Sequence, residues 1–255
     1  MSIEARLNKL VARKDANTTA AVEKFKERMS GVVSRLDSRI QKMVRTYAET
    51  NNLENLDLGF ALHSRAELQS ALTEVGYFDA VDEFMGGYSG VIDGVVEQYR
   101  LFDTALSLSP TSVEVIKQLQ QFDINFFQNL GNQTTETLYR ALYEHTLTPV
   151  PFESVVSVVR GTLEGTALQK YSYTYANDTI MRFERSVNAI TAEETGWTKV
   201  KYIGPADAVT RPFCMAHVGK EYTKEEAQAM KNDFGRSAWV EGGGYNCRHS
   251  WVAVP

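Results

Sequence analysis

The first 50 residues carry the hydrophobic spacing of a single long helix. The segment contains no proline, and its only glycine is Gly31. Apolar side chains recur at alternating steps of four and three residues, which places them on one stripe of a helix, as in a coiled-coil seam. The stripe consists of Met29, Val33, Leu36, Ile40, Met43 and Tyr47. We expect a long amphipathic helix that binds a partner surface, either in the rest of this chain or in another subunit.

Helical patterns continue through the middle of the chain. Residues 49–59 are polar and rich in asparagine, which indicates a connector. Helices are expected over residues 64–76, 78–106, 109–122, 133–145 and most of 152–194, with a break at two prolines in 148–151. Gly86, Gly90 and Gly94 lie four residues apart. This spacing either permits close helix packing or marks a break between two shorter helices.

The pattern changes at Gly196. The stretch GWTKVKYIG alternates and is rich in β-forming residues, which predicts a strand, and YNCRHSWVAV predicts a final strand. Between them, Thr223 followed by Glu226 has the spacing of a capping box that opens a short helix. The sequence therefore predicts a mainly α protein with a small C-terminal α+β module. We expect three segments: a helical arm (1–50), a helical domain (51–195) and the module (196–255).

Composition is that of a folded protein outside the membrane. Of 255 residues, 43% are hydrophobic and 23% are charged. No apolar run approaches the ~18 residues needed to span a bilayer. The N-terminal residues lack the apolar core of a signal peptide, so we expect synthesis in a cytoplasm. Two cysteines are too few for a disulfide scaffold.

Charge is distributed unevenly along the chain. Residues 1–50 have a net charge of +5, whereas residues 51–110 have a net charge of −8. One interpretation is that the basic arm contacts an acidic partner or DNA. The other is a solvated outer helix face, and this is favoured because acids are interleaved with the basic residues and aromatic residues are not.

Both cysteines and two of the four histidines fall in the last 42 residues. They form two short pairs, Cys214-x-x-His217 and Cys247-x-His249. Four such ligands suit a tetrahedral zinc ion, and a Cys-x-His pair on a strand would point both side chains to one face. Two alternatives stay open: a Cys214–Cys247 disulfide outside the cell, and buried cysteines that pack as small apolar groups. The last is favoured.

A catalytic role for these residues has little support in the sequence. A cysteine nucleophile could take His217 or His249 as its base, with Asp207 orienting the base. However, the chain has neither a nucleophile elbow nor a glycine-rich nucleotide loop. The carboxylates from Asp207 to Glu226 lack metal-binding or glycosidase spacing. We therefore expect no enzymatic activity, and no cofactor other than the candidate structural zinc.

An ordered set of residues between about 179 and 254 resembles the C-terminal domain of phage head morphogenesis proteins, the Mu F-like minor head proteins. A helix carries an Arg-x-Glu and a following Asn, a strand follows, and then come a Thr-Arg-Pro with a nearby Cys, a Gly-x-x-aromatic, and a glycine-rich loop into Asn-Cys-Arg-His. The residues that carry the resemblance, besides the two cysteines and His249, are Arg182, Glu184, Asn188, Asp207, Thr210, Arg211, Pro212, Gly219, Tyr222, Gly243, Asn246 and Arg248. The family usually has a cysteine where this chain has His249.

The resemblance implies a minor structural protein of a tailed-phage virion. Such a protein is made in the bacterial cytoplasm and resides inside the head, bound to the portal, capsid or scaffolding protein in several copies. It assists head assembly, or the packaging or ejection of the genome, and the basic arm could contact packaged DNA. The alternative function is a metal-dependent enzyme or DNA-processing factor that uses the Cys/His cluster.

Two structural predictions follow from the motif residues. Arg211 and Arg248 are expected to be partly buried, each paired with a carboxylate or with carbonyls at a strand end, because the planar guanidinium suits such sites. Asp207 is the first candidate partner and Glu184 the second. Gly242–Gly244 is expected to adopt backbone angles closed to other residues, which brings the last strand close to the Cys214 loop.

Overall fold

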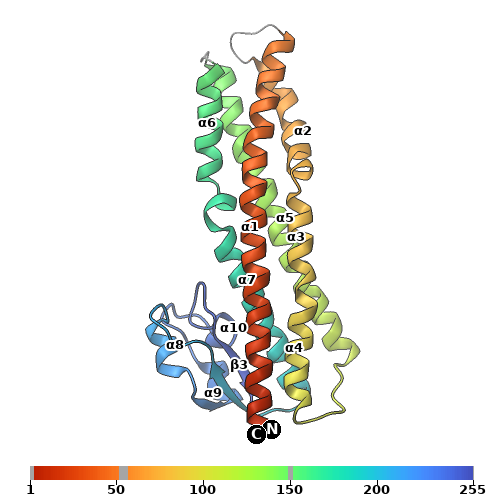
Figure 1. Ribbon diagram of the computed structural model, residues 1–255, viewed down its shortest axis with the longest axis vertical. Coiled ribbons are helices and arrows are strands. Elements are labelled where there is room, and N and C mark those ends of the chain that lie inside the picture. Colours follow the sequence, from red (N-terminus) through yellow and green to blue (C-terminus); the bar gives the residue numbers. More distant parts are fainter. Residues whose placement is uncertain (1–2, 52–56, 149–151, 255) are drawn as a thin grey trace. The chain divides into compact units, whose positions relative to one another are not determined.

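The structure is a computed structural model that describes residues 3–51, 57–148 and 152–254. The predicted fold class is confirmed. The chain is 76% helical, with a small three-stranded antiparallel sheet near its C-terminus (Figure 1). None of the described helices has an apolar stretch long enough to cross a bilayer.

Seven helices of the described chain precede the sheet. Their bounds are α1 Ile3–Asn51, α2 Leu58–Glu74, α3 Tyr77–Gly86, α4 Tyr88–Arg100, α5 Pro110–Leu147, α6 Phe152–Gly165 and α7 Ala167–Glu194. The break between α3 and α4 shows that the glycines around residue 87 divide two shorter helices. In contrast, α5 is continuous where two helices were expected. Its Gly131 packs so closely that a Cβ there would lie 2.6 Å from the Tyr77 ring.

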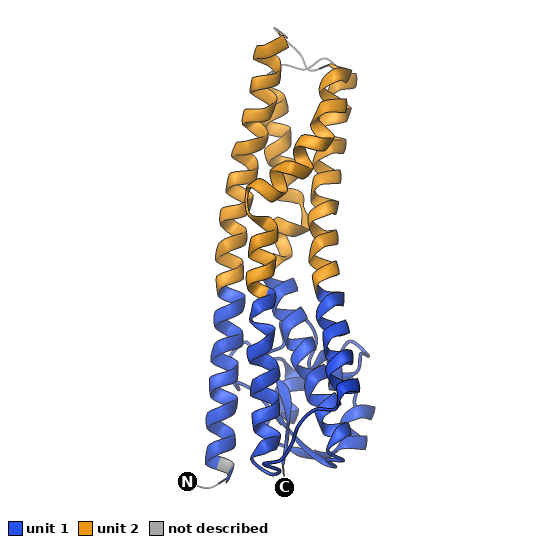
Figure 2. Ribbon diagram, turned by 90° about the vertical axis from the view of Figure 1, so that its right-hand side faces the viewer, with its two compact units in different colours: residues 1–23, 85–123, 173–255 blue, residues 24–84, 124–172 orange. Residues whose placement is uncertain are grey.

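The described chain forms two compact units, coloured separately in Figure 2. Unit 1 comprises residues 1–23, 85–123 and 173–255, and unit 2 comprises residues 24–84 and 124–172. This division differs from the three consecutive segments expected from the sequence, because α1, α5 and α7 each contribute residues to both units.

The apolar stripe of α1 packs within its own chain. In unit 2, Met29, Leu36 and Ile40 are at most 1% exposed, and Met43 is also buried. Of the two partner surfaces expected for this stripe, the structure supports the rest of the same chain. Val33 and Tyr47 are only half-buried, while Val32 and Val44 are fully buried in their place. The reason is that a helix of 3.6 residues per turn drifts by ~20° per heptad relative to a strict seven-residue repeat.

Several basic residues of α1 pair with acids from the segment that carries the negative charge. In unit 1, Arg13 pairs with Glu97. In unit 2, Lys24 and Arg28 share Glu83, and Arg39 contacts Glu67 and Glu74. The opposite net charges of residues 1–50 and 51–110 therefore offset each other partly within the chain.

The C-terminal sheet has the strand order β2-β1-β3, with both pairings antiparallel. The strands are β1 Lys199–Ile203, β2 Glu221–Thr223 and β3 Ser250–Ala253, and the short helices are α8 Pro212–His217, α9 Lys224–Ala229 and α10 Ala238–Glu241. The predicted capping box is confirmed at the start of α9. The final strand is shorter than expected and begins only at Ser250, so Cys247 and His249 precede it instead of lying on it.

Candidate functional site

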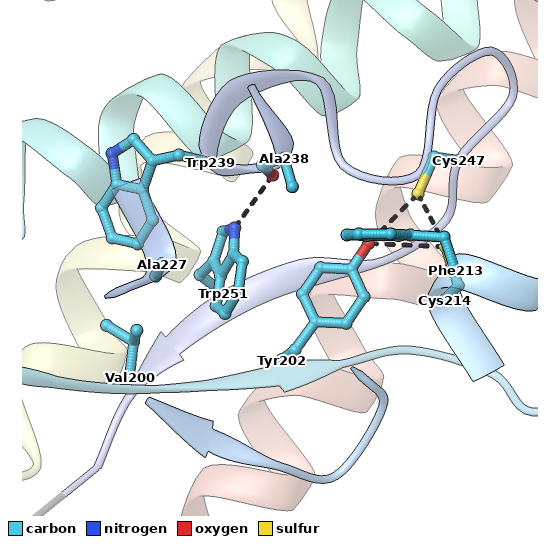
Figure 3. Packing of buried hydrophobic residues seen from close by; sticks show 9 residues of the cluster. All are labelled: Val200, Tyr202, Phe213, Cys214, Ala227, Ala238, Trp239, Cys247 and Trp251. Carbon is cyan, nitrogen blue, oxygen red and sulfur yellow. Dashed lines mark hydrogen bonds between the residues drawn. The ribbon is translucent and has the colours of Figure 1, made fainter. Parts of the chain in front are cut away.

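The sheet and its short helices enclose an aromatic cluster that ends at the two cysteines (Figure 3). Strand β1 alternates, so that Val200 and Tyr202 point into the cluster. Trp251 on β3 packs beside them, and its indole Nε1 donates a hydrogen bond to the Ala238 carbonyl oxygen at 3.1 Å. The cysteines are thus held by a rigid, apolar surrounding.

The structure brings three of the four predicted ligands together. Cys214 lies on α8, which Pro212 opens at its first turn, and Cys247 lies in the segment between α10 and β3. Both are free thiols with their Sγ atoms 3.7 Å apart. The Nδ1 atom of His249 is 3.8 Å from the Cys247 Sγ. One ligand atom from each of these residues, which we call the Cys/His cluster, lies within 4.8 Å of the others.

His217 lies outside the Cys/His cluster. Its Nδ1 is 2.7 Å from the Tyr222 hydroxyl oxygen, and its ring packs on Phe213 with centroids 4.5 Å apart. Burial lowers the pKa of this imidazole below its usual range. The prediction of a four-ligand set that includes His217 is therefore not supported, because the end of α8 turns this side chain toward β2.

Tyr202 also contacts the sulfurs, and it was not among the predicted site residues. Its hydroxyl oxygen is 3.5 Å from the Cys214 Sγ and 3.7 Å from the Cys247 Sγ. Its ring stacks on His249 at an interplanar angle of 13°. Burial raises its pKa well above the usual range, so the hydroxyl keeps its proton in this surrounding. The alternation in GWTKVKYIG would have placed it on the buried face.

Arg185, on α7, is a buried arginine that binds the module, and it was not predicted from the sequence. Its guanidinium donates to the carbonyl oxygens of His249 (2.7 and 2.9 Å), Cys247 (3.0 Å) and Val240 (3.2 Å). The side chain is held by backbone carbonyls next to a strand, which was one of the two kinds of contact predicted for Arg211 and Arg248. Its spacing of four from Met181 would have placed it on the buried face of α7.

The two arginines named in the prediction have different surroundings. Arg248 pairs with Asp207 at 2.7 Å, which confirms the first candidate partner, but both side chains are more than 40% exposed. The guanidinium holds the pKa of the Asp207 carboxyl well below its usual range. Arg211 is half-buried at the N-cap of α8, with no ion pair to the residues that the structure describes.

Glu184, the second candidate partner of Arg211 and Arg248, contacts other residues. It is 1% exposed and forms a buried ion pair with Lys14 of α1, and it accepts a hydrogen bond from the Ser250 hydroxyl. This ion pair joins α1 and α7 to the first residue of β3 within unit 1.

The pKa values of the two cysteines shift in opposite directions. The hydrogen bond from Cys214 lowers the pKa of Cys247, and His249, Arg185 and the Gly243 N–H, which donates to the Cys247 Sγ at 3.1 Å, act in the same direction. The contact with Cys247, together with burial, raises the pKa of Cys214. Of the two, Cys247 therefore loses its proton more readily.

The glycine run lets the chain approach the cysteines. Gly242 and Gly244 have φ values of 54° and 101°, which confirms the prediction at these two positions. Gly243 is required for a different reason: a Cβ there would lie 2.3 Å from the Cys214 Sγ. The close approach of the last segment to α8 thus depends on the absence of a side chain.

The remaining motif residues form local contacts in unit 1. Arg182 pairs with Glu241 at 3.4 Å, and Asn188 accepts a hydrogen bond from the Tyr99 hydroxyl at 3.1 Å. The Thr210 hydroxyl lies between Asp207 and the Pro205 carbonyl. Gly219 and Asn246 have positive φ values of 82° and 53°.

Comparisons of the chain with protein-family models, with curated proteins and with solved structures give no match.

Proposed function

We propose that this chain is a minor structural protein of a tailed-phage head. It resides inside the head close to the portal, contacts the portal, capsid or scaffolding protein, and assists assembly or the passage of the genome. The proposal rests on the motif residues that resemble the Mu F-like minor head proteins.

One structural observation supports this proposal. The motif residues lie between positions 182 and 249, inside the stretch 173–255 of unit 1. Several have contacts or backbone angles that hold the module together, such as the Arg248–Asp207 ion pair and the packing of Gly243 on Cys214. A set of residues with structural roles is what a shared fold would require of its members.

The basic arm receives less support as a DNA-binding element. DNA affinity comes largely from Lys and Arg side chains that neutralise phosphates. In this chain Lys14, Lys24 and Arg28 already pair with carboxylates of the same unit. Contacts with a head protein are therefore the preferred role of the chain.

The experiment that tests the proposal is the composition of purified particles. The gene is interrupted by an amber codon in the phage or prophage that encodes it and is supplied in trans. We expect quantitative mass spectrometry to detect several copies per procapsid and per virion, and we expect the yield of infectious particles to fall without the supplied gene. Absence of the chain from both procapsids and virions would overturn the proposal.

The second candidate function is a metal-dependent enzyme or DNA-processing factor that would use the Cys/His cluster. A catalytic zinc site keeps one position open for water or substrate. Here the cluster is buried, since Cys214, Cys247 and His249 are each at most 3% exposed. Cleavage of supercoiled plasmid by the purified chain, abolished in Cys247→Ser but retained in His217→Ala, would replace the structural proposal with this one.

A further inference from the structure

Two of the separations between ligand atoms of the Cys/His cluster match those of a tetrahedral metal site, and all of its ligand atoms lie within 4.8 Å of one another. With Zn–S bonds of ~2.3 Å and Zn–N bonds of ~2.0–2.1 Å, tetrahedral angles place two sulfurs ~3.8 Å apart and a sulfur and a nitrogen ~3.6 Å apart. The Sγ–Sγ distance between Cys214 and Cys247 is 3.7 Å, and the distance from Cys247 Sγ to His249 Nδ1 is 3.8 Å. A disulfide would instead require the sulfurs to approach to ~2.05 Å.

The Tyr202 hydroxyl lies beside both sulfurs of the cluster, within the reach of a fourth ligand. For a Zn–O distance of ~2.0 Å, the same geometry puts an oxygen ~3.5 Å from each sulfur. The observed distances are 3.5 Å to Cys214 and 3.7 Å to Cys247. Figure 3 shows the tyrosine hydroxyl directed toward the two sulfurs. The position that a catalytic site would leave open is therefore filled by a side chain.

The hydrogen bonding of His249 supplies an independent observation. The residue is 3% exposed, yet its Nε2 has no hydrogen-bond partner in the described chain. Its Nδ1 has only the distant contact with the Cys247 Sγ. Buried polar groups are nearly always satisfied, so an imidazole without an ordinary hydrogen bond calls for a ligand. A metal ion bound to Nδ1 would give that nitrogen a strong ligand in place of the 3.8 Å contact with Cys247, while Nε2 would carry the ring proton.

We propose that Cys214, Cys247 and His249 bind one Zn²⁺ ion in a closed structural site, with the Tyr202 hydroxyl at the fourth corner. Two thiolates balance the charge of the ion, and binding releases to solvent the protons that the thiols still hold. The Gly243 N–H donates to one sulfur, and Arg185 fixes the carbonyls of Cys247 and His249. The ion would tie α8, β1 and the segment before β3 together.

The inference is independent of the proposed phage function and is tested on the full chain. Metal-free protein, prepared with chelator and reductant, is titrated with Co²⁺ as a spectroscopic probe and then with Zn²⁺. We expect one Co²⁺ per chain, with thiolate-to-cobalt charge transfer and the visible bands of a tetrahedral site, and full displacement by Zn²⁺. Folded, reduced protein that takes up no stoichiometric Co²⁺ overturns the proposal. Isolation of the chain with a Cys214–Cys247 disulfide and no metal overturns it as well.

Four variants separate the roles of the residues. Cys214→Ser and Cys247→Ser should weaken Co²⁺ binding by at least about 100-fold, because each removes a ligand and the loss of even an outer partner costs about 10–100-fold. His217→Ala is the matched control and should bind as the wild type does. Tyr202→Phe should alter the visible bands and weaken binding about 10-fold. An unchanged spectrum in Tyr202→Phe would overturn its place at the fourth corner, and equal losses in His217→Ala would overturn the ligand set.

Discussion

Replacing Arg185 by methionine should destabilise the C-terminal module more than any exposed substitution on the same helix. The methionine keeps much of the apolar stem and removes the guanidinium. The guanidinium makes four hydrogen bonds to three carbonyl oxygens, those of Val240, Cys247 and His249. Its side chain is buried, so water does not replace these bonds in the folded state.

The expected magnitude follows from the carbonyls that lose their donor. Each buried polar group left unsatisfied costs about 1–3 kcal/mol, and the three costs overlap because one side chain makes all the bonds. Relief from burying a charge offsets part of the loss. We expect a decrease of about 4 kcal/mol in the free energy of unfolding. At about 2–4 °C per kcal/mol for a chain of this size, the Tm should fall by roughly 8–16 °C.

The chain offers a selective assay and a matched control. All three tryptophans, Trp197, Trp239 and Trp251, lie in the last 60 residues, so tryptophan fluorescence in a urea titration reports on the module, whereas far-UV circular dichroism reports mainly on the helices. The control is Arg182→Met, three residues earlier on α7, where the side chain is 41% exposed and has one ion pair at 3.4 Å. Its loss should cost under about 1 kcal/mol. If Arg185→Met shifts the fluorescence transition no more than Arg182→Met does, the reasoning is refuted.

Three further predictions concern other contacts of the fold. Gly243→Ala should lower the free energy of unfolding by about 2–3 kcal/mol, and the Tm with it, because its Cβ would overlap the Cys214 sulfur. The control Gly161→Ala, in a helix with open space around that position, should raise the Tm slightly. Equal effects of the two variants would contradict the packing argument. Lys14→Met should lower the free energy of unfolding, measured by chemical denaturation, by about 3 kcal/mol, because it leaves the buried Glu184 carboxylate without its cation. Adding Glu184→Met should recover part of that loss. A further loss in the double variant would count against this explanation. The Arg248 guanidinium lowers the pKa of Asp207 in the folded state, so the stability that this pair contributes is present above the unfolded pKa of about 3.9 and is lost as pH falls through the folded value. Asp207→Asn should therefore show a smaller decline in Tm below pH 4 than the wild type. Parallel declines in the two proteins would argue against a stabilising Asp207–Arg248 pair.

The sequence contained enough information to predict the elements of the fold. The long N-terminal helix, the start of α5 at Pro110, the strand β1 and the capping box of α9 were all visible, because hydrophobic period and capping depend on residues close together in the chain. The glycine run before β3 was also correctly expected to adopt unusual backbone angles, at Gly242 and Gly244. Local rules sufficed for these features.

The sequence also indicated that the last 42 residues hold a Cys/His cluster, but not which residues would form it. Cys214 and Cys247 are 33 positions apart, and whether they meet depends on the path of the chain between them. The end of α8 directs His217 toward Tyr222, and the pleat of β1 brings Tyr202 to the sulfurs instead. These outcomes depend on how separate elements dock, and no local pattern encodes that.

What the sequence by itself determined is a mainly α chain with a small α+β module and a group of soft ligands near its end. Only the tertiary structure decided that the stripe of α1 packs on its own chain and that the buried arginine is Arg185, 64 residues before the His249 carbonyl that it binds. The physical reason is the range of the interactions. Helix and strand periods arise from neighbours a few residues apart, whereas burial of a charge or the approach of two sulfurs depends on segments brought together by the whole fold.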